Sequence, residues 1–302
     1  MWYNKNEEII QWLYTEKSIK INKGGLIMKV NAGKTSKSKV VEYNNMNEFY
    51  KYLCDTPFND SFRWEVHQSV IASESFTQTK NFEEAVELMK NGWKDMSEKL
   101  VQRLKVEEQR MEPVMKPKTV YGVAGYQAVV PLYLNGVPTN MLSKKQVPVK
   151  QKVITLNKCI NYSWTWETKD IVEESIKAFR IIKKLEANGY RCNLNVILGA
   201  SNVHDDNEAY IIKIRVKNST EKLNVSKLAF PLVHPSMLRR LMFRWQEVFP
   251  SVSKGFVANY GHPMKKEEMA KVFDLEKGEY ILPAKITKDV TKITGIEDLG
   301  DI

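Results

Sequence analysis

The sequence contains no long apolar run and few cysteines. No stretch approaches the run of about 18 apolar residues that a membrane-spanning helix needs, so we expect no membrane partner. The three cysteines, Cys54, Cys159 and Cys192, are widely spaced and form no CxxC pair, which argues against a disulfide framework or a zinc ribbon. Charged residues interrupt the N-terminal stretch, which is not typical of a secretory signal. These absences predict a cytoplasmic protein.

Motifs for catalysis are also missing. Gly33-Lys34-Thr35 resembles the end of a phosphate-binding loop, but the position of the leading glycine is occupied by Met28. Asp205, Asp206 and Glu208 could hold the metal of a nuclease, yet they lie in a polar stretch typical of a surface turn. We therefore expect no catalytic residue, no metal and no cofactor, and keep a metal-dependent nuclease as an alternative.

Positive charge is abundant and unevenly distributed. The chain has 46 lysines and arginines against 36 acids, a formal net charge of +10. Three stretches, 28–41, 113–166 and 222–246, contain no acid and hold 16 of the basic residues, so the remainder is mildly acidic. Clustered positive charge focuses the electric field and is typical of a surface that faces a polyanion. Nucleic acid is one such partner, and an acidic protein is the alternative.

The candidate binding residues lie in the second and third of these stretches. They are the basic residues Lys144, Lys145, Lys150, Lys152, Arg239, Arg240 and Arg244. Arg239 lies near the start of a helix predicted from His234-Pro235, where backbone N–H groups favour an anion such as phosphate. The alternative is structural: Arg240 or Arg244 pairs with Glu247 or another carboxylate and braces the fold, and His234 caps the helix without acting as a catalytic base.

Apolar periodicity predicts helices first and then alternating strands and helices. The expected elements are helices near 47–54, between Asn81 and Gly92 and at 96–109, strands within Tyr121 to Leu134 before a turn at Asn135-Gly136, a strand at 153–160, a helix between Thr168 and Gly189, and strands at 191–198 and 210–216. Strand, helix and strand in this order imply a right-handed parallel crossover. We predict an α/β fold, α+β overall, with a helical N-terminal part followed by a three-layer Rossmann-like part.

Four segments are predicted along the chain. They are a flexible basic segment at 1–42, a mainly helical part at 43–115, the α/β part at 116–288 and an acidic tail at 289–302. Because Lys23-Gly24-Gly25 can be encoded by a bacterial ribosome-binding sequence, we expect translation to start at Met28. The alternative for residues 1–27 is an ordinary short helix.

The loop Asn161-Tyr162-Ser163-Trp164-Thr165 follows the first strand of the crossover. It resembles the metal-binding loop of von Willebrand factor A domains, whose pattern is Asp-x-Ser-x-Ser at the end of the first strand. Asn161 stands where that family has aspartate, which removes the carboxylate that a divalent cation most needs. The resemblance implies a related fold with an inactive metal site, and a coincidental polar loop is the alternative.

A second resemblance is carried by several segments. They are Phe82-Glu83-Glu84-Ala85 with Asn91-Gly92-Trp93, Tyr133 to Met141, Leu185 to Arg191 and Phe230 to Arg240. These segments are similar to an uncharacterised family of phage and prophage proteins, and the likeness spans residues 76–250. It implies a bacteriophage origin and a place in the cytoplasm of a bacterial host, and it transfers no catalytic residue.

Two classes of function follow. The first is a phage-encoded, non-enzymatic binding protein whose basic surfaces engage DNA or a nucleoprotein complex. The second is a phage protein that inhibits a host defence complex or assembles into the virion. It would bury aromatic anchors such as Trp64, Trp93 or Trp164 against a host or phage protein. Assembly as a homo-oligomer belongs to the second class.

Overall fold

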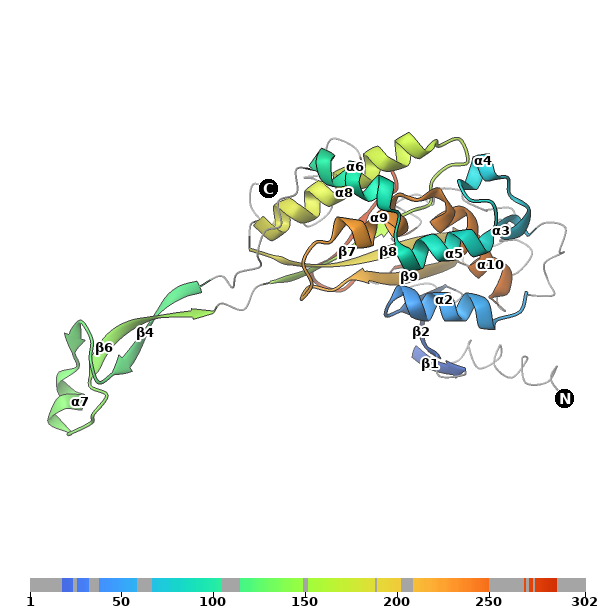
Figure 1. Ribbon diagram of the computed structural model, residues 1–302. Helices are drawn as coiled ribbons and strands as arrows, with labels where there is room; N and C mark the ends of the chain where they lie inside the picture. Colours follow the sequence, from blue (N-terminus) through green and yellow to red (C-terminus); the bar gives the residue numbers. More distant parts are fainter. Residues whose placement is uncertain are drawn as a thin grey trace.

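The computed structural model describes residues 18–23, 26–32, 38–58, 67–104, 115–148, 152–187, 189–201, 209–249, 269, 272–273 and 275–286. They form a mixed α/β fold, as the sequence predicts, and its strands make two separate sheets. The seven-stranded sheet lies in the main body with the helices, and the three-stranded sheet forms an arm that projects from it (Figure 1). In the part of the chain described, no helix is both long and apolar enough to cross a membrane.

The large sheet combines parallel and antiparallel pairs. In spatial order its strands are β1 (Ser18–Lys23), β2 (Leu26–Ala32), β3 (Lys39–Tyr43), β9 (Ala209–Lys217), β8 (Arg191–Ser201), β7 (Val153–Cys159) and β10 (Glu279–Leu282). β7 and β8 are parallel and are connected by α8 (Thr168–Ala187), so the parallel strand–helix–strand order of the prediction is confirmed. β9 is antiparallel to β8 and parallel to β3, which makes the sheet mixed.

The strands β1, β2 and β3 form one edge of the large sheet, where the sequence predicts a flexible segment. The sequence predicts a flexible segment at 1–42, but β1 and β2 form an antiparallel pair and β3 joins them to β9. Val40 and Val41 in β3 are 6% and 0% exposed, respectively. Branched side chains fit a half-buried pleated surface, and here this preference outweighs the surrounding lysines and serines.

Nine further helices accompany α8 in the described residues. They are α2 (Met46–Asp55), α3 (Gln68–Ile71), α4 (Glu74–Thr77), α5 (Phe82–Asn91), α6 (Lys94–Leu104), α7 (Val130–Leu134), α9 (Val225–Val233), the π-helix η2 (Met237–Met242) and α10 (Phe243–Val248). The predicted Asn81 cap is confirmed, since its side chain accepts from the N–H of Glu84 at 2.8 Å. Gly92 ends α5 with a φ of 79°, a conformation that favours glycine.

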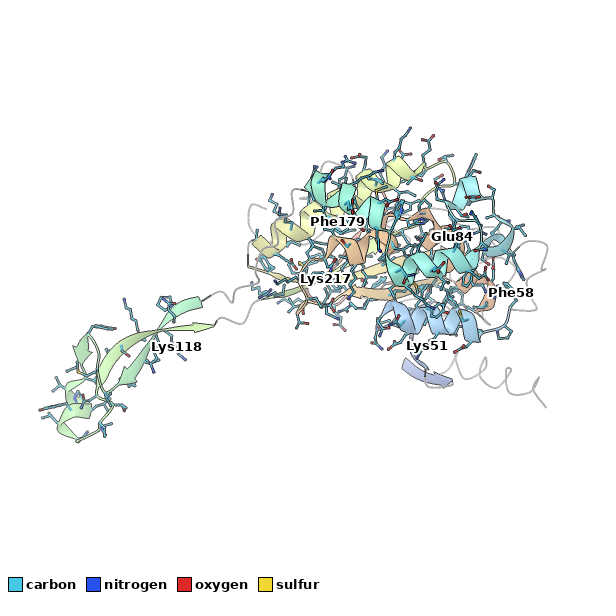
Figure 2. The ribbon with its side chains drawn as sticks, in the orientation of Figure 1. Lys51, Phe58, Glu84, Lys118, Phe179 and Lys217 are labelled. Carbon is cyan, nitrogen blue, oxygen red and sulfur yellow. The ribbon has the colours of Figure 1, made fainter. Side chains whose placement is uncertain are left out.

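One buried cluster runs through the main body from Val40 to Ile286. α9 contacts α8 and β9, while α6 packs on α9 and α8, and α5 packs on η2 and α9. The indole N–H of Trp245 in α10 donates to the hydroxyl of Tyr43 in β3 at 2.7 Å, and Phe179 of α8 is fully buried (Figure 2). The helices at 46–104 therefore share a core with the strands that follow the arm.

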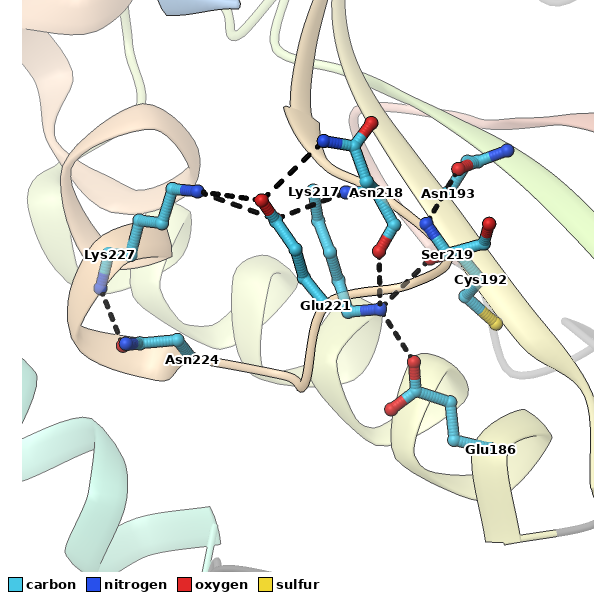
Figure 3. A network of polar contacts seen from close by, with 9 residues as sticks. All are labelled: Glu186, Cys192, Asn193, Lys217, Asn218, Ser219, Glu221, Asn224 and Lys227. Carbon is cyan, nitrogen blue, oxygen red and sulfur yellow. Dashed lines mark hydrogen bonds and ion pairs between the residues drawn. The ribbon is translucent and has the colours of Figure 1, made fainter. Parts of the chain in front are cut away.

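A buried lysine ties three elements together near the end of β9 (Figure 3). Lys217 is 2% exposed, and its ammonium donates to the carboxylate of Glu186 in α8 at 2.7 Å. It also donates to the carbonyls of Cys192 in β8 at 2.9 Å and Asn218 at 3.3 Å. Because a buried charge is costly unless it is paired and hydrogen-bonded, we assign this lysine a structural role.

Candidate binding interface

The arm consists of residues 115–148. Its strands, in spatial order, are β4 (Met115–Gly122), β6 (Met141–Pro148) and β5 (Gln127–Ala128), and α7 lies at the tip (Figure 1). The sequence predicts one or two strands and no helix within Tyr121 to Leu134. Strands end and begin there in β4 and β5, but Val130–Leu134 is helical. Pro131 in the first turn has a backbone angle suited to a helix start. The turn predicted at Asn135-Gly136 is confirmed, with a φ of 69° at the glycine.

A glycine lets the short strand β5 join the arm. A Cβ atom at Gly125 would lie 2.0 Å from the carbonyl oxygen of Leu142 in β6. The next residue, Tyr126, donates its N–H to that same carbonyl at 2.8 Å. Any side chain at Gly125 would therefore push the third strand away from the other two.

The arm has no buried core. Every residue from 117 to 146 is exposed or intermediate in burial. Half of the large apolar side chains that the structure exposes lie on it: Tyr121, Val123, Tyr126, Val130, Tyr133 and Leu134. Exposed apolar groups gathered in one place mark an interaction surface on a soluble protein. The arm is therefore the candidate binding interface.

Lysines lie on the part of the arm nearest the body. Lys118 and Lys145 are direct partners across β4 and β6, and Lys144 faces Thr119 in the next pair. All three lysines are exposed, as Figure 2 shows for Lys118. The ammonium of Lys144 lies 5.8 Å from the ring centre of Tyr126. The arm therefore presents cations and aromatic rings together.

The other two predicted lysines, Lys150 and Lys152, precede β7 in the sequence. Lys152 is exposed directly before this strand. Lys150 lies outside the described residues, as do Asp205, Asp206, Glu208 and Trp64. Lys158, from the same acid-free stretch, is fully buried and donates to the carbonyls of Pro283 and Ala284 at 2.7 and 2.8 Å. Burial lowers the pKa of the Lys158 ammonium to about 8.

Arg239 and Arg240 lie inside the body. Arg240 is 0% exposed and donates to five carbonyl oxygens, those of Ser69, Val70, Ala72, Thr79 and Lys80. Arg239 is 4% exposed and donates to the carbonyls of three residues, Phe76, Ser163 and Trp166. Burial lowers the pKa of Arg239 to about 10. These contacts are structural, and the partner-binding role that the sequence suggests for both residues stays a prediction.

Arg244, Glu247 and His234 also have partners within the protein. Arg244 stacks on the ring of Phe58 at 3.5 Å, while Glu247 accepts from the backbone N–H and the hydroxyl of Ser69. His234 is 4% exposed, and its Nδ1 atom accepts from the N–H of Ser236 at 3.1 Å. Burial lowers the pKa of His234 to about 4. The capping alternative for His234 therefore agrees with the structure.

In the loop that follows β7, the side chains of Asn161, Ser163 and Thr165 are hydrogen-bonded to β8 or to each other. Asn161 is 1% exposed and bonds Gly199 of β8 through both its amide nitrogen and its amide oxygen. The hydroxyls of Ser163 and Thr165 lie 3.0 Å apart. Among the residues described, no group of three or more histidine, cysteine, aspartate or glutamate side chains could hold a metal ion.

The uncharged character of the arm tip could have been read from the sequence. Residues 119–143 contain no charged side chain, so the lysines of the acid-free stretch lie on either side of this segment. The exposure of its tyrosines depends on the projection of the segment from the body, which no local sequence pattern indicates.

The protein is thus a mixed α/β protein with a projecting arm in which no residue from 117 to 146 is buried. The chain belongs to a family of proteins that share a domain of unknown function, DUF7192, which matches residues 20–298. No curated protein and no solved structure is detectably similar to it.

Proposed function

We propose that this chain is a non-enzymatic binding protein that engages nucleic acid, alone or in a nucleoprotein complex, through the lysines of its arm. The observation that carries the proposal is an exposed two-stranded ribbon with Lys118, Lys144 and Lys145 on it and no acid between residues 113 and 166. A two-stranded β-ribbon is of a size that the major groove of duplex DNA admits. Lysines on such a ribbon can neutralise backbone phosphates.

The pairing of Lys118 with Lys145 supports a polyanionic ligand. Like charges directly opposite each other on neighbouring strands destabilise the pair. A phosphate group between them would relieve this repulsion and strengthen the ribbon. The resemblance to phage and prophage proteins supports a role during infection, such as binding phage DNA or a host defence complex.

The test is the binding of a short fluorescent DNA duplex followed by anisotropy. We expect the affinity to fall steeply between about 50 and 200 mM salt, because phosphate contacts release counterions. Replacing Lys144 and Lys145 by glutamine should lower the slope of log affinity against log salt by about 2. The matched control replaces Lys51 and Lys99, two exposed lysines on helices of the body, and should leave the slope unchanged. Equal slopes for all three proteins would reject the arm as the nucleic-acid surface.

A protein partner is the second candidate function. The specific observation in its favour is the uncharged, exposed tip between residues 119 and 143, which phosphate binding does not explain. Binding that survives high salt and is lost with changes at the tip would support this candidate.

A further inference from the structure

The tip of the arm has the composition of the centre of a protein interface. Charged residues are depleted and tyrosine and methionine are enriched at such centres, while charged residues gather at the rim. Tyr121, Tyr133 and Leu134 are 61%, 67% and 77% exposed, and no charge lies between 119 and 143. The lysines of the arm border this apolar surface on the side of the body. A binding site that complements the tip would be apolar and would have carboxylates at its border.

The body offers a pocket with these properties. It has a volume of about 510 Å³ and lies between α4, the loop after β7 and the start of α8. Phe76, Trp164 and Trp166 give it aromatic walls. Trp164 is 73% exposed although it is a large apolar side chain. An exposed indole beside a pocket can receive an apolar group from another molecule.

The charges around the pocket are mixed. Glu167 lines the pocket with a side chain that is 69% exposed, and the cations Lys169 and Arg239 line it too. Lys169 pairs with Glu167 at 2.9 Å, and Arg239 is 4% exposed and donates to backbone carbonyls. Glu74 begins α4 and Asp170 lies in the first turn of α8, so two further carboxylates adjoin the lining residues. These three carboxylates outnumber the two cations of the lining by one. The lysines of the acid-free arm would therefore meet a weak attraction there, whereas two arms facing each other would repel.

The tip and the pocket lie at opposite ends of the molecule. The arm precedes Val153 at the start of β7, whereas the pocket follows Cys159 at the end of the same strand. Figure 1 shows the arm at one end of the body and α4 toward the other. Each chain therefore presents its tip away from its own pocket, in a position to meet that of a neighbour.

We propose that the arm tip of one chain docks into the pocket beside Trp164 of a second copy. The contact joins two different surfaces, so it leaves a free tip at one end and a free pocket at the other. Such heterologous contacts build open chains unless the rotation between copies closes a ring. This self-assembly is distinct from the nucleic-acid binding proposed above, since the uncharged tip enters the pocket and the lysines only border the contact.

The test is sedimentation velocity of the purified full chain after nuclease treatment, over a range of protein concentrations. We expect the mean mass to rise with concentration beyond that of a dimer. Leu134→Asp at the tip and Trp164→Asp at the pocket should each give monomers. Both side chains are exposed, so an unchanged melting temperature should accompany each loss. Val101→Asp, an exposed site on α6, is the matched control and should assemble like the parent protein.

Mixing the two defective variants distinguishes this arrangement from others. The intact pocket of Leu134→Asp can accept the intact tip of Trp164→Asp, so the mixture should form a one-to-one dimer and nothing larger. Monomers of the parent protein at every concentration would overturn the proposal. A dimer that persists in Trp164→Asp, or assembly that nuclease abolishes, would overturn it as well, in favour of arm-to-arm pairing or bridging by nucleic acid.

Discussion

The side-chain amide of Asn161 makes two hydrogen bonds to the backbone of Gly199, one as donor and one as acceptor. Its Nδ2 donates to the Gly199 carbonyl at 2.6 Å, and its Oδ1 accepts from the Gly199 N–H at 3.0 Å. Asn161 follows β7 and Gly199 lies in β8, so the two bonds extend the pairing of these strands beyond the ladder. Asn161, which stands where the resembled family has a metal-binding aspartate, thus connects two neighbouring strands.

Changing Asn161 to aspartate should destabilise the protein. A carboxylate can still accept from the Gly199 N–H, but its second oxygen would face the Gly199 carbonyl without a donor. Leaving a buried polar group unpaired costs about 1–3 kcal/mol. Urea unfolding should show this loss in the free energy of unfolding. Magnesium should not restore the stability of Asn161→Asp, and a restoration would mean that the loop can still bind a metal.

Arg240 should be essential for folding stability. Its guanidinium donates to five carbonyls in the segment from Ser69 to Lys80, which it joins to η2. Lysine keeps the charge but has only three donors and no planar fork. Arg240→Lys should therefore lower the free energy of unfolding by about 3 kcal/mol, because several buried acceptors lose their donors.

The control for this variant is Arg103→Lys. Arg103 pairs with Glu173 at 2.7 Å, but both side chains are about half exposed. Exposed ion pairs contribute little, so this change should stay within about 0.5 kcal/mol of the parent protein. Equal effects of the two substitutions would contradict the structural role assigned to Arg240.

His234 should make stability depend on mildly acidic pH. Burial lowers its pKa from 6.5 to about 4, so the unfolded chain takes up a proton before the folded chain does. Its contribution to stability is therefore complete above pH 6.5 and is lost as the pH falls from 6.5 toward 4. In His234→Asn the amide oxygen can still accept from Ser236, and the group does not titrate. Unfolding free energies of the variant should fall less over this window, whereas parallel pH profiles would exclude His234 as the cause.

The crossover was predictable because its pattern is local. The apolar spacing within Thr168–Ala187 is that of a helix, and the strands on both sides are rich in branched residues. The capped helix after Asn81 was predictable for the same reason. The strands at 18–32 also have a local pattern, which the expectation of a flexible segment overlooked. Ile19 and Ile21 alternate with polar residues, and Gly24-Gly25 separates the two runs as in a hairpin.

Long-range contacts account for most of what the sequence analysis missed. Arg239 and Arg240 were candidate binding residues, with a structural alternative for Arg240. Their acceptors lie far away in the chain, up to 171 positions for Arg240. Trp93 was a candidate anchor, and it packs against the core, with its ring 4.5 Å from that of His234. Trp164 is the suggested anchor that the structure leaves exposed. No local sequence pattern distinguishes the buried candidates from the exposed one.

The most direct test of the account removes the arm itself. We would replace residues 117–146 by a short Gly-Ser turn and measure the melting temperature and the anisotropy of labelled duplex DNA. Because no residue in this range is buried, the melting temperature should stay within a few degrees of the parent value, and DNA binding should be lost. A variant that melts alike and still binds DNA with the same salt dependence would contradict the central claim that the arm is the binding surface.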